Sequence, residues 1–222
     1  MAHPGQWSPT RLVLAPTLFN IYTNDLPETS SRKFIYADDI CCAVQCRSFS
    51  EIESSLSSDT SSWAEYCRRW RLKPSATKTV TSVFHLHNAS ASRELDVSMD
   101  GHGQLLKHER YPVYLGVTLD RTLSYRQHLQ KTAAKVKTRN NLLSKLAGST
   151  WGANATTLRT SALALCYSVA EYCCPVWSRS AHTGLFDAQL NSSMRLISGT
   201  LRPTQVAWLP VLSNITPPNI RR

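Results

Sequence analysis

The sequence contains few features of a membrane or secreted protein. No apolar run approaches the roughly 18 residues that a membrane-spanning helix needs. The apolar stretch at residues 12–15 is too short for the core of a secretory signal peptide. The seven cysteines include no C-x-x-C pair, so the paired spacing of a zinc site is missing. We therefore expect an intracellular, non-secreted protein with reduced thiols and no membrane partner.

Acidic residues are nearly missing from the second half of the chain. Of 15 Asp and Glu residues, only Glu171 and Asp187 lie in residues 121–222. The net charge is therefore −1 over residues 1–120 and +11 over residues 121–222. Such clustering favours a polyanionic partner such as nucleic acid, because solubility alone does not require basic residues to cluster.

The composition is that of a folded protein. Hydrophobic residues make up 42% of the 222 residues and charged residues 18%, which excludes global disorder, collagen and coiled-coil arrays. The length suffices for one large domain or two small ones.

The first 120 residues mix helix and strand signals, which predicts an α+β fold. Pro16 suits the first turn of a helix, and Ser50 with Glu53 forms a capping box for another. The Asp100-Gly101 pair favours a hairpin turn. The predicted elements are a helix from 16 to about 22, a hairpin of 34–36 with 40–44, a helix over 50–69, a strand over 79–86, a hairpin of 97–99 with 105–106, and a strand over 111–119.

After Asp120 the pattern is helical. One helix is predicted between a capping box at Ser124 and Gln127 and a stop at Gly148. Lys131, Lys135 and Arg139 share one face of that helix. Asn154 can cap the next helix, and a Pro-rich tail begins at Arg202. Two predicted core stripes follow the helical period: Leu158, Ala162, Leu165, Val169, Tyr172 and Val176 in one helix, and Phe186, Leu190, Met194 and Ile197 in the other.

Two adjacent carboxylates, Asp38 and Asp39, stand at the tip of the first predicted hairpin. Held by buried apolar strands, such a pair can bind hard divalent cations through oxygen. Asp is also common in ordinary turns, and the pair on its own favours that simpler interpretation.

The surrounding motifs change this interpretation. The segment 34–39, FIYADD, resembles the Y-x-D-D hairpin of reverse transcriptases. Residues 14–22 resemble the helix before it, 70–79 the segment called motif D, and 114–120 the primer-grip region of non-LTR, LINE-type elements. His128, Tyr172 and residues 175–177 resemble the thumb and following helices of jockey-like elements. The resemblance covers Pro9 to Arg222, and implies a partial polymerase palm over 1–120 and a basic helical thumb or connection region over 121–222.

The resemblance implies RNA-directed DNA polymerase chemistry with two Mg²⁺ ions. Asp38 and Asp39 would be the metal ligands. Lys78 would protonate the leaving pyrophosphate, although an ordinary surface lysine explains it equally well. The implied partners are an RNA template, a DNA primer or target and deoxynucleoside triphosphates, and the implied compartment is the nucleus or the cytoplasm.

The resemblance also implies nucleic-acid contacts. Tyr36 would lie beside the primer end, and three residues, Tyr114, Leu115 and Gly116, would hold the primer backbone. The face with Lys131, Lys135 and Arg139 would grip duplex phosphates. A merely solvated helix face is the alternative.

The sequence departs from the family pattern at three places. Residues 1–15 contain no Asp or Glu, so we expect the family's further aspartate strand and the fingers region to be absent. Pro9 is followed by Thr10-Arg11-Leu12 instead of a P-Q-G-S-like turn, and Ser75 replaces the usual asparagine of motif D. An inactive, nucleic-acid-binding remnant is therefore the alternative to an active polymerase fragment, and a relic reading frame without a selected role is a third hypothesis.

Overall fold

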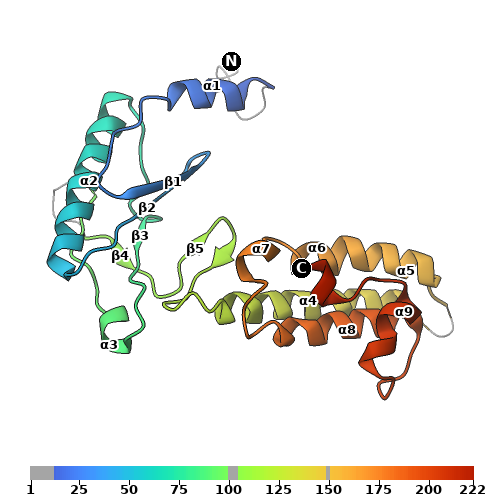
Figure 1. Ribbon diagram of the computed structural model, residues 1–222. Coiled ribbons are helices and arrows are strands. Elements are labelled where there is room, and N and C mark those ends of the chain that lie inside the picture. Colours follow the sequence, from blue (N-terminus) through green and yellow to red (C-terminus); the bar gives the residue numbers. More distant parts are fainter. Residues whose placement is uncertain (1–12, 100–104, 149–150) are drawn as a thin grey trace. The chain divides into compact units, whose positions relative to one another are not determined.

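The computed structural model describes residues 13–99, 105–148 and 151–222, which divide into two compact units (Figure 1). The first unit contains the described residues up to 83 together with 92–109, and the second contains 84–91 and 110–222. Mixed helices and small sheets agree with the predicted α+β class. The segment 114–116 belongs to the unit that holds the helices of the second half.

The first unit contains a hairpin and a long helix. Its described elements are α1 (Ala15–Tyr22), β1 (Arg32–Tyr36), β2 (Asp39–Ala43), α2 (Phe49–Arg69), β3 (Val80–Thr81) and β4 (Lys107–His108). Strands β1 and β2 pair antiparallel, and β3 pairs parallel with β4. Pro16 lies in the first turn of α1, as predicted. Ser98 forms an isolated antiparallel bridge with Leu105. The predicted turn at Asp100 and Gly101 lies outside the described residues.

Helix α2 begins almost where the sequence predicts, but its cap is different. The side chain of Ser48 accepts a hydrogen bond from the Glu51 N–H at 3.3 Å. The predicted Ser50–Glu53 box is wrong, because Ser48 has the extended backbone of a capping residue and Ser50 already lies inside the helix. Leu95, Val97 and Leu106 are buried beside the start of this helix.

Two predicted strands are shorter than expected. The strand predicted over 79–86 is confined to β3. The strand predicted over 111–119 is a hairpin of β5 (Val113–Tyr114) and β6 (Val117–Thr118). The chain reverses because Leu115 and Gly116 have φ of +46° and +78°, values that interrupt an extended strand.

The second unit is a helical bundle. Helix α4 packs along α8, and α5 contacts both (Figure 1). Its described elements besides β5 and β6 are α3 (Asn88–Ala91), α4 (Arg126–Leu146), α5 (Ala155–Ala162), the π-helix η2 (Leu163–Tyr167), α6 (Ser168–Ala170), α7 (Cys174–Trp177), α8 (Gly184–Ser198), the 3₁₀-helix η3 (Val206–Trp208), α9 (Leu209–Ser213) and α10 (Pro218–Arg221).

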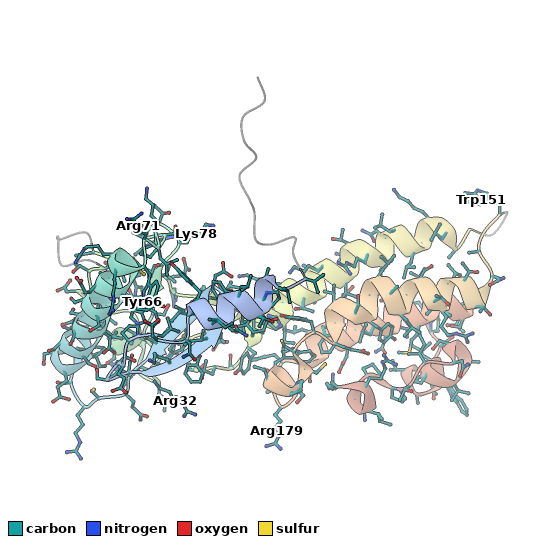
Figure 2. All side chains as sticks on the ribbon, turned by 90° about the horizontal axis from the view of Figure 1, so that it is seen from above. Arg32, Tyr66, Arg71, Lys78, Trp151 and Arg179 are labelled. Atoms are coloured by element: carbon teal, nitrogen blue, oxygen red, sulfur yellow. The ribbon has the colours of Figure 1, made fainter. Side chains whose placement is uncertain are left out.

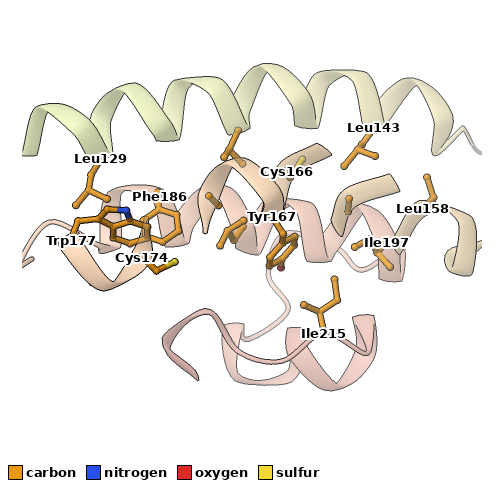
Figure 3. Packing of buried hydrophobic residues seen from close by; sticks show 14 residues of the cluster. Leu129, Leu143, Leu158, Cys166, Tyr167, Cys174, Trp177, Phe186, Ile197 and Ile215 are labelled. Atoms are coloured by element: carbon orange, nitrogen blue, oxygen red, sulfur yellow. The ribbon is translucent and has the colours of Figure 1, made fainter. Parts of the chain in front are cut away.

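The bundle core is large and apolar, as Figure 3 shows. The stripe predicted for α8 is confirmed in full, since all four of its residues are buried. Trp177 and Phe186 meet edge to face with ring centroids 5.1 Å apart. Asn154 caps α5 as predicted, accepting from the Thr157 N–H at 2.9 Å.

The stripe predicted from Leu158 onward is wrong after Ala162. Leu165 is 37% exposed and Tyr172 is 51% exposed, whereas Cys166 is buried. The cause is η2, because a π-helical segment adds residues to a turn and so rotates the face that later residues present.

The start of α4 is organised by Asp120. Its carboxylate accepts hydrogen bonds from the N–H groups of Thr122, Ser124 and Arg126 and from the hydroxyls of Thr122 and Ser124, at 2.8 to 3.3 Å. The predicted Ser124–Gln127 box is therefore wrong. The carboxylate of Asp120, which precedes the helix by several residues, binds the N–H groups at its start instead.

The Pro-rich tail after Arg202 is structured. Leu209 and Ile215 are buried. Arg221 pairs with Glu171 and Arg222 with Asp187, each through two guanidinium nitrogens. Both acidic residues of the basic half are thus paired. No helix in the described part of the chain is long and apolar enough to cross a membrane.

Candidate functional site

The two candidate metal ligands lie at the tip of the β1–β2 hairpin. Tyr36 pairs with Asp39, so the loop consists of only Ala37 and Asp38. Ala37 has φ of +51°, and such left-handed residues let a two-residue loop follow the strand twist. Asp38 therefore belongs to the turn, and Asp39 is the first residue of β2.

Both carboxylates face solvent. Asp38 and Asp39 are exposed, and their carboxylates form no hydrogen bond or ion pair with any residue that the structure describes. Exposed carboxylate oxygens are chemically suited to a hard cation such as Mg²⁺. In the ranges 13–99, 105–148 and 151–222, however, no three or more His, Cys, Asp or Glu side chains are grouped to hold a metal. The chain thus offers a pair of oxygen donors, and the described residues do not complete a site.

The hairpin strands are not buried, contrary to expectation. Phe34, Ile35 and Ile40 are 42 to 46% exposed, and Tyr36 is 66% exposed. The physical reason is that β1 and β2 form a two-stranded ribbon, and no further described strand pairs with it. Tyr36 is close to Asp38 and Asp39 in the sequence, and its exposed ring is accessible to a ligand.

Asp59 of α2 positions the start of this hairpin. Its carboxylate accepts from the N–H groups of Ser30 and Ser31, both at 2.9 Å, and from the Ser30 hydroxyl at 3.1 Å. Asp59 is only 4% exposed. Burial alone would raise the pKa of Asp59, but the hydrogen bonds from Ser31 and Ser30 outweigh it and lower the pKa.

Sequence reasoning missed Asp59, although a signal was present. The apolar stripe of α2 contains Ile52, Leu56 and Trp63, and Asp59 fills the helical position between the last two. A charged residue on a core stripe needs buried hydrogen-bond partners, and here they are the backbone amides that lead into β1.

Lys78 lies in the first unit, after α2, and is exposed. Figure 2 shows its side chain, like that of Arg71, projecting outward. Its backbone N–H donates to the Ser75 carbonyl at 3.1 Å. The Lys78 ammonium contacts neither Asp38 nor Asp39 within the described structure, so the fold leaves it available to solvent or to a ligand.

The candidate primer-binding residues Tyr114, Leu115 and Gly116 form the turn region of the β5–β6 hairpin. The Leu115 carbonyl accepts a hydrogen bond from the Tyr172 hydroxyl at 2.8 Å. At the other end of β6, the Thr118 N–H donates to Nδ1 of His128 at 3.3 Å. The hairpin is therefore attached to the helical bundle.

The predicted basic face of α4 is only partly free. Lys131 and Lys135 are exposed, and the Lys131 ammonium lies 3.3 Å from the Thr118 hydroxyl. Arg139 is half-buried, and its guanidinium donates to the carbonyl of Leu165 in η2. Two of the three predicted phosphate-binding residues thus remain exposed, and the third supports the bundle.

His128 lies beneath this face and is 7% exposed. Burial lowers the pKa of His128, and the positive charges of Lys135 and Lys131 lower it further. A neutral imidazole agrees with Nδ1 accepting the Thr118 N–H.

Comparison with known proteins gives curated relatives from flies. The chain is 28% identical over 204 residues to a probable RNA-directed DNA polymerase from transposon BS of Drosophila melanogaster, covering 86% of this chain and 22% of that protein. It is 29% identical over 140 residues to the RNA-directed DNA polymerase from mobile element jockey of Drosophila funebris, covering 59% of this chain and 15% of the relative. A third relative, from transposon X-element of Drosophila melanogaster, is 25% identical over 207 residues and is matched over 21% of its length.

The chain therefore spans about a fifth or less of these relatives. No family model matches the chain, and no solved structure matches it.

Proposed function

We propose that this chain, whose curated homologues are RNA-directed DNA polymerases of non-LTR retrotransposons, supplies metal-binding carboxylates and a duplex-binding surface for RNA-templated DNA synthesis. The observation that carries the proposal is the pair of exposed carboxylates, Asp38 and Asp39, at the tip of the β1–β2 hairpin. The hairpin has the same residue pattern, FIYADD, that suggested the family from sequence.

In the proposed reaction the oxygen of a primer 3′-hydroxyl bonds to the α-phosphorus of a deoxynucleoside triphosphate. The bond between the α-phosphorus and the bridging oxygen breaks, pyrophosphate leaves, and the proton of the 3′-hydroxyl passes to solvent water. Asp38 and Asp39 would hold Mg²⁺, which supplies charge stabilisation to the attacking and leaving oxygens. Lys78 is the proposed proton donor to pyrophosphate, and the exposed ring of Tyr36 is the proposed contact for the primer end.

In the second unit the exposed residues Lys131 and Lys135 are the proposed contacts to duplex phosphates. The pairing of Glu171 and Asp187 with arginines supports this role, because it reduces the repulsion that these carboxylates would exert on a polyanion. Phosphate contacts of this kind do not depend on base sequence and weaken as salt rises.

Primer extension on an RNA template with Mg²⁺ tests the catalytic proposal. Replacing one metal-binding carboxylate, in Asp38→Asn, should reduce extension by about 10²-fold or more, as the loss of a charge-stabilising group does elsewhere. Glu51→Gln is the matched control, because Glu51 is an exposed acid on α2 of the same unit. Extension that persists in Asp38→Asn would contradict the assignment.

A nucleic-acid-binding role without catalysis is the second candidate. It is favoured by the finding that the described residues provide only a pair of carboxylates at the tip and by the charge of +11 over residues 121–222. Salt-sensitive binding of an RNA–DNA duplex without extension would support it. The double variant Lys131→Glu, Lys135→Glu should lose that binding, while Lys137→Glu, on another face of α4, should retain most of it. Unchanged affinity in the double variant would rule out the proposed face.

A further inference from the structure

A side chain from outside the β5–β6 hairpin binds the backbone of its turn. The hydroxyl of Tyr172, a residue between α6 and α7, donates to the Leu115 carbonyl at 2.8 Å. Leu115 has φ of +46°, a left-handed conformation that a non-glycine residue rarely adopts. A turn in this conformation persists only when its surroundings fix it, and the Tyr172 hydroxyl is a direct contact that does so.

Gly116 explains how the tyrosine ring reaches the turn. A Cβ at this position would lie 3.2 Å from Cε1 of Tyr172, and Gly116 has φ of +78°. The absence of a side chain therefore serves both the backbone conformation and the close approach of the ring.

Tyr172 is itself fixed by the bundle core. Its backbone carbonyl accepts from Nε1 of Trp177 at 2.9 Å. Trp177 is 1% exposed and packs edge to face on Phe186 (Figure 3). The contact thus connects the buried core to the partly exposed turn.

The base of the same hairpin is also tied to the bundle. The Thr118 N–H donates to His128, and the Lys131 ammonium contacts the Thr118 hydroxyl. With Tyr172 at the turn and α4 at the base, the hairpin is constrained at both ends. A hairpin that is already constrained loses less conformational entropy when a ligand binds, so binding is more favourable.

We infer that Tyr172 is a positioning residue, which presets the Leu115–Gly116 turn to receive the sugar-phosphate backbone of a primer strand. This inference rests on the proposed function and on the primer contact that the resemblance implies for Tyr114, Leu115 and Gly116. Tyr172 acts through the turn and makes no phosphate contact in this role. Its loss should therefore weaken duplex binding without changing the number of phosphates that the protein neutralises.

The test compares three variants for binding to a fluorescent RNA–DNA template–primer duplex over a range of salt. Tyr172→Phe keeps the ring and removes the hydrogen-bond donor. Gly116→Ala places a methyl group against the ring. Tyr125→Phe is the control, because it removes a hydroxyl from the same unit that makes no hydrogen bond to any described residue. Hydrogen exchange over residues 113–118 reports the order of the turn in each protein.

We expect Tyr172→Phe to lower duplex affinity by roughly three- to tenfold, the range for one lost hydrogen bond. The slope of log affinity against log salt should stay unchanged, since no phosphate contact is lost. Exchange at the turn should accelerate. Gly116→Ala should behave similarly, and Tyr125→Phe should match the unmodified chain.

Three results would overturn the inference. If Tyr172→Phe lowers the melting temperature but leaves affinity and exchange at the turn unchanged, Tyr172 only stabilises the bundle. If the unmodified chain binds no duplex at all, the proposed function fails and the inference fails with it. Binding that persists equally in every variant would reject the inference alone.

Discussion

At the scale of single residues, two buried aspartates determine local geometry. Asp59 is 4% exposed and Asp120 is 6% exposed. Each carboxylate accepts hydrogen bonds from at least two backbone N–H groups of a loop. Asp59 holds the loop before β1, and Asp120 holds the loop before α4. In each case one carboxylate replaces the backbone partners that an irregular segment lacks.

Asp59→Asn should destabilise the first unit by about 1.5 to 3 kcal/mol, the range for hydrogen bonds to a charged group. The amide keeps the size of the side chain but offers only one acceptor oxygen to the Ser30 and Ser31 amides. Urea unfolding followed by tryptophan fluorescence measures the change. Glu65→Gln, an exposed acid of the same helix, should change stability by less than about 0.5 kcal/mol. Equal effects in the two variants would show that Asp59 has no anchoring role.

At the scale of elements, the guanidinium group of Arg139 forms a hydrogen bond with the backbone of the π-helix η2. A π-helical segment disturbs the regular hydrogen bonds of its helix, and the Leu165 carbonyl within it accepts from Arg139 of α4. Arg139 therefore contributes to helix packing, although its spacing from Lys131 and Lys135 had indicated a shared phosphate-binding face.

Arg139→Gln should lower the free energy of unfolding of the second unit by about 1 kcal/mol. It should leave the salt dependence of duplex binding unchanged, because Arg139 is already bonded to protein. Lys135→Gln should do the reverse, leaving stability nearly unchanged and reducing the salt slope by roughly 0.9. Urea titration and binding at several salt concentrations measure both effects. A reduced slope of log affinity against log salt in Arg139→Gln would show that Arg139 does contact phosphates.

The elements show where sequence reasoning succeeds. The stripe of α8 and the Asn154 cap were predicted correctly, because both depend on regular spacing or on a neighbour three residues away. The Asp38–Asp39 tip was also located correctly, since apolar runs flank it on both sides. In these cases the determining interactions are local.

The failures have non-local or irregular causes. The break at Leu115 requires a left-handed non-glycine residue, which strand propensity does not indicate. The packing stripe is lost beyond Ala162 because periodic reasoning assumes one helix type throughout. The Asp59 contacts span 28 and 29 residues, so no local spacing rule could have identified them.

At the scale of the whole molecule, several buried groups make stability sensitive to acid. Hydrogen bonds from Ser124 and Thr122 outweigh burial and lower the pKa of Asp120, as they do for Asp59 with its own donors. Burial, followed by the nearby lysines, lowers the pKa of His128. For all three groups the unfolded chain binds protons more readily than the folded protein.

Below about pH 8.5, the ordinary pKa of cysteine, stability should therefore be highest above about pH 6.5, the ordinary pKa of histidine. It should fall as the pH drops through the lowered pKa of His128, and fall again below pH about 4 as Asp59 and Asp120 are protonated. Urea unfolding at a series of pH values measures this profile. Asp120→Asn should flatten the acidic part for the second unit. A stability that stays constant or rises between pH 7 and pH 3 would contradict the assigned pKa directions.

The irregular helix η2 also has a consequence for evolutionary comparison. A π-helical segment commonly corresponds to one extra residue within an α-helix, so relatives without this insertion would be offset by one position after Leu163–Tyr167. An ungapped alignment of this region would then pair buried residues such as Tyr167 with solvent-facing ones. In an alignment of this region, buried residues should be paired with buried residues and exposed residues with exposed ones. A one-residue gap within η2 restores that pairing.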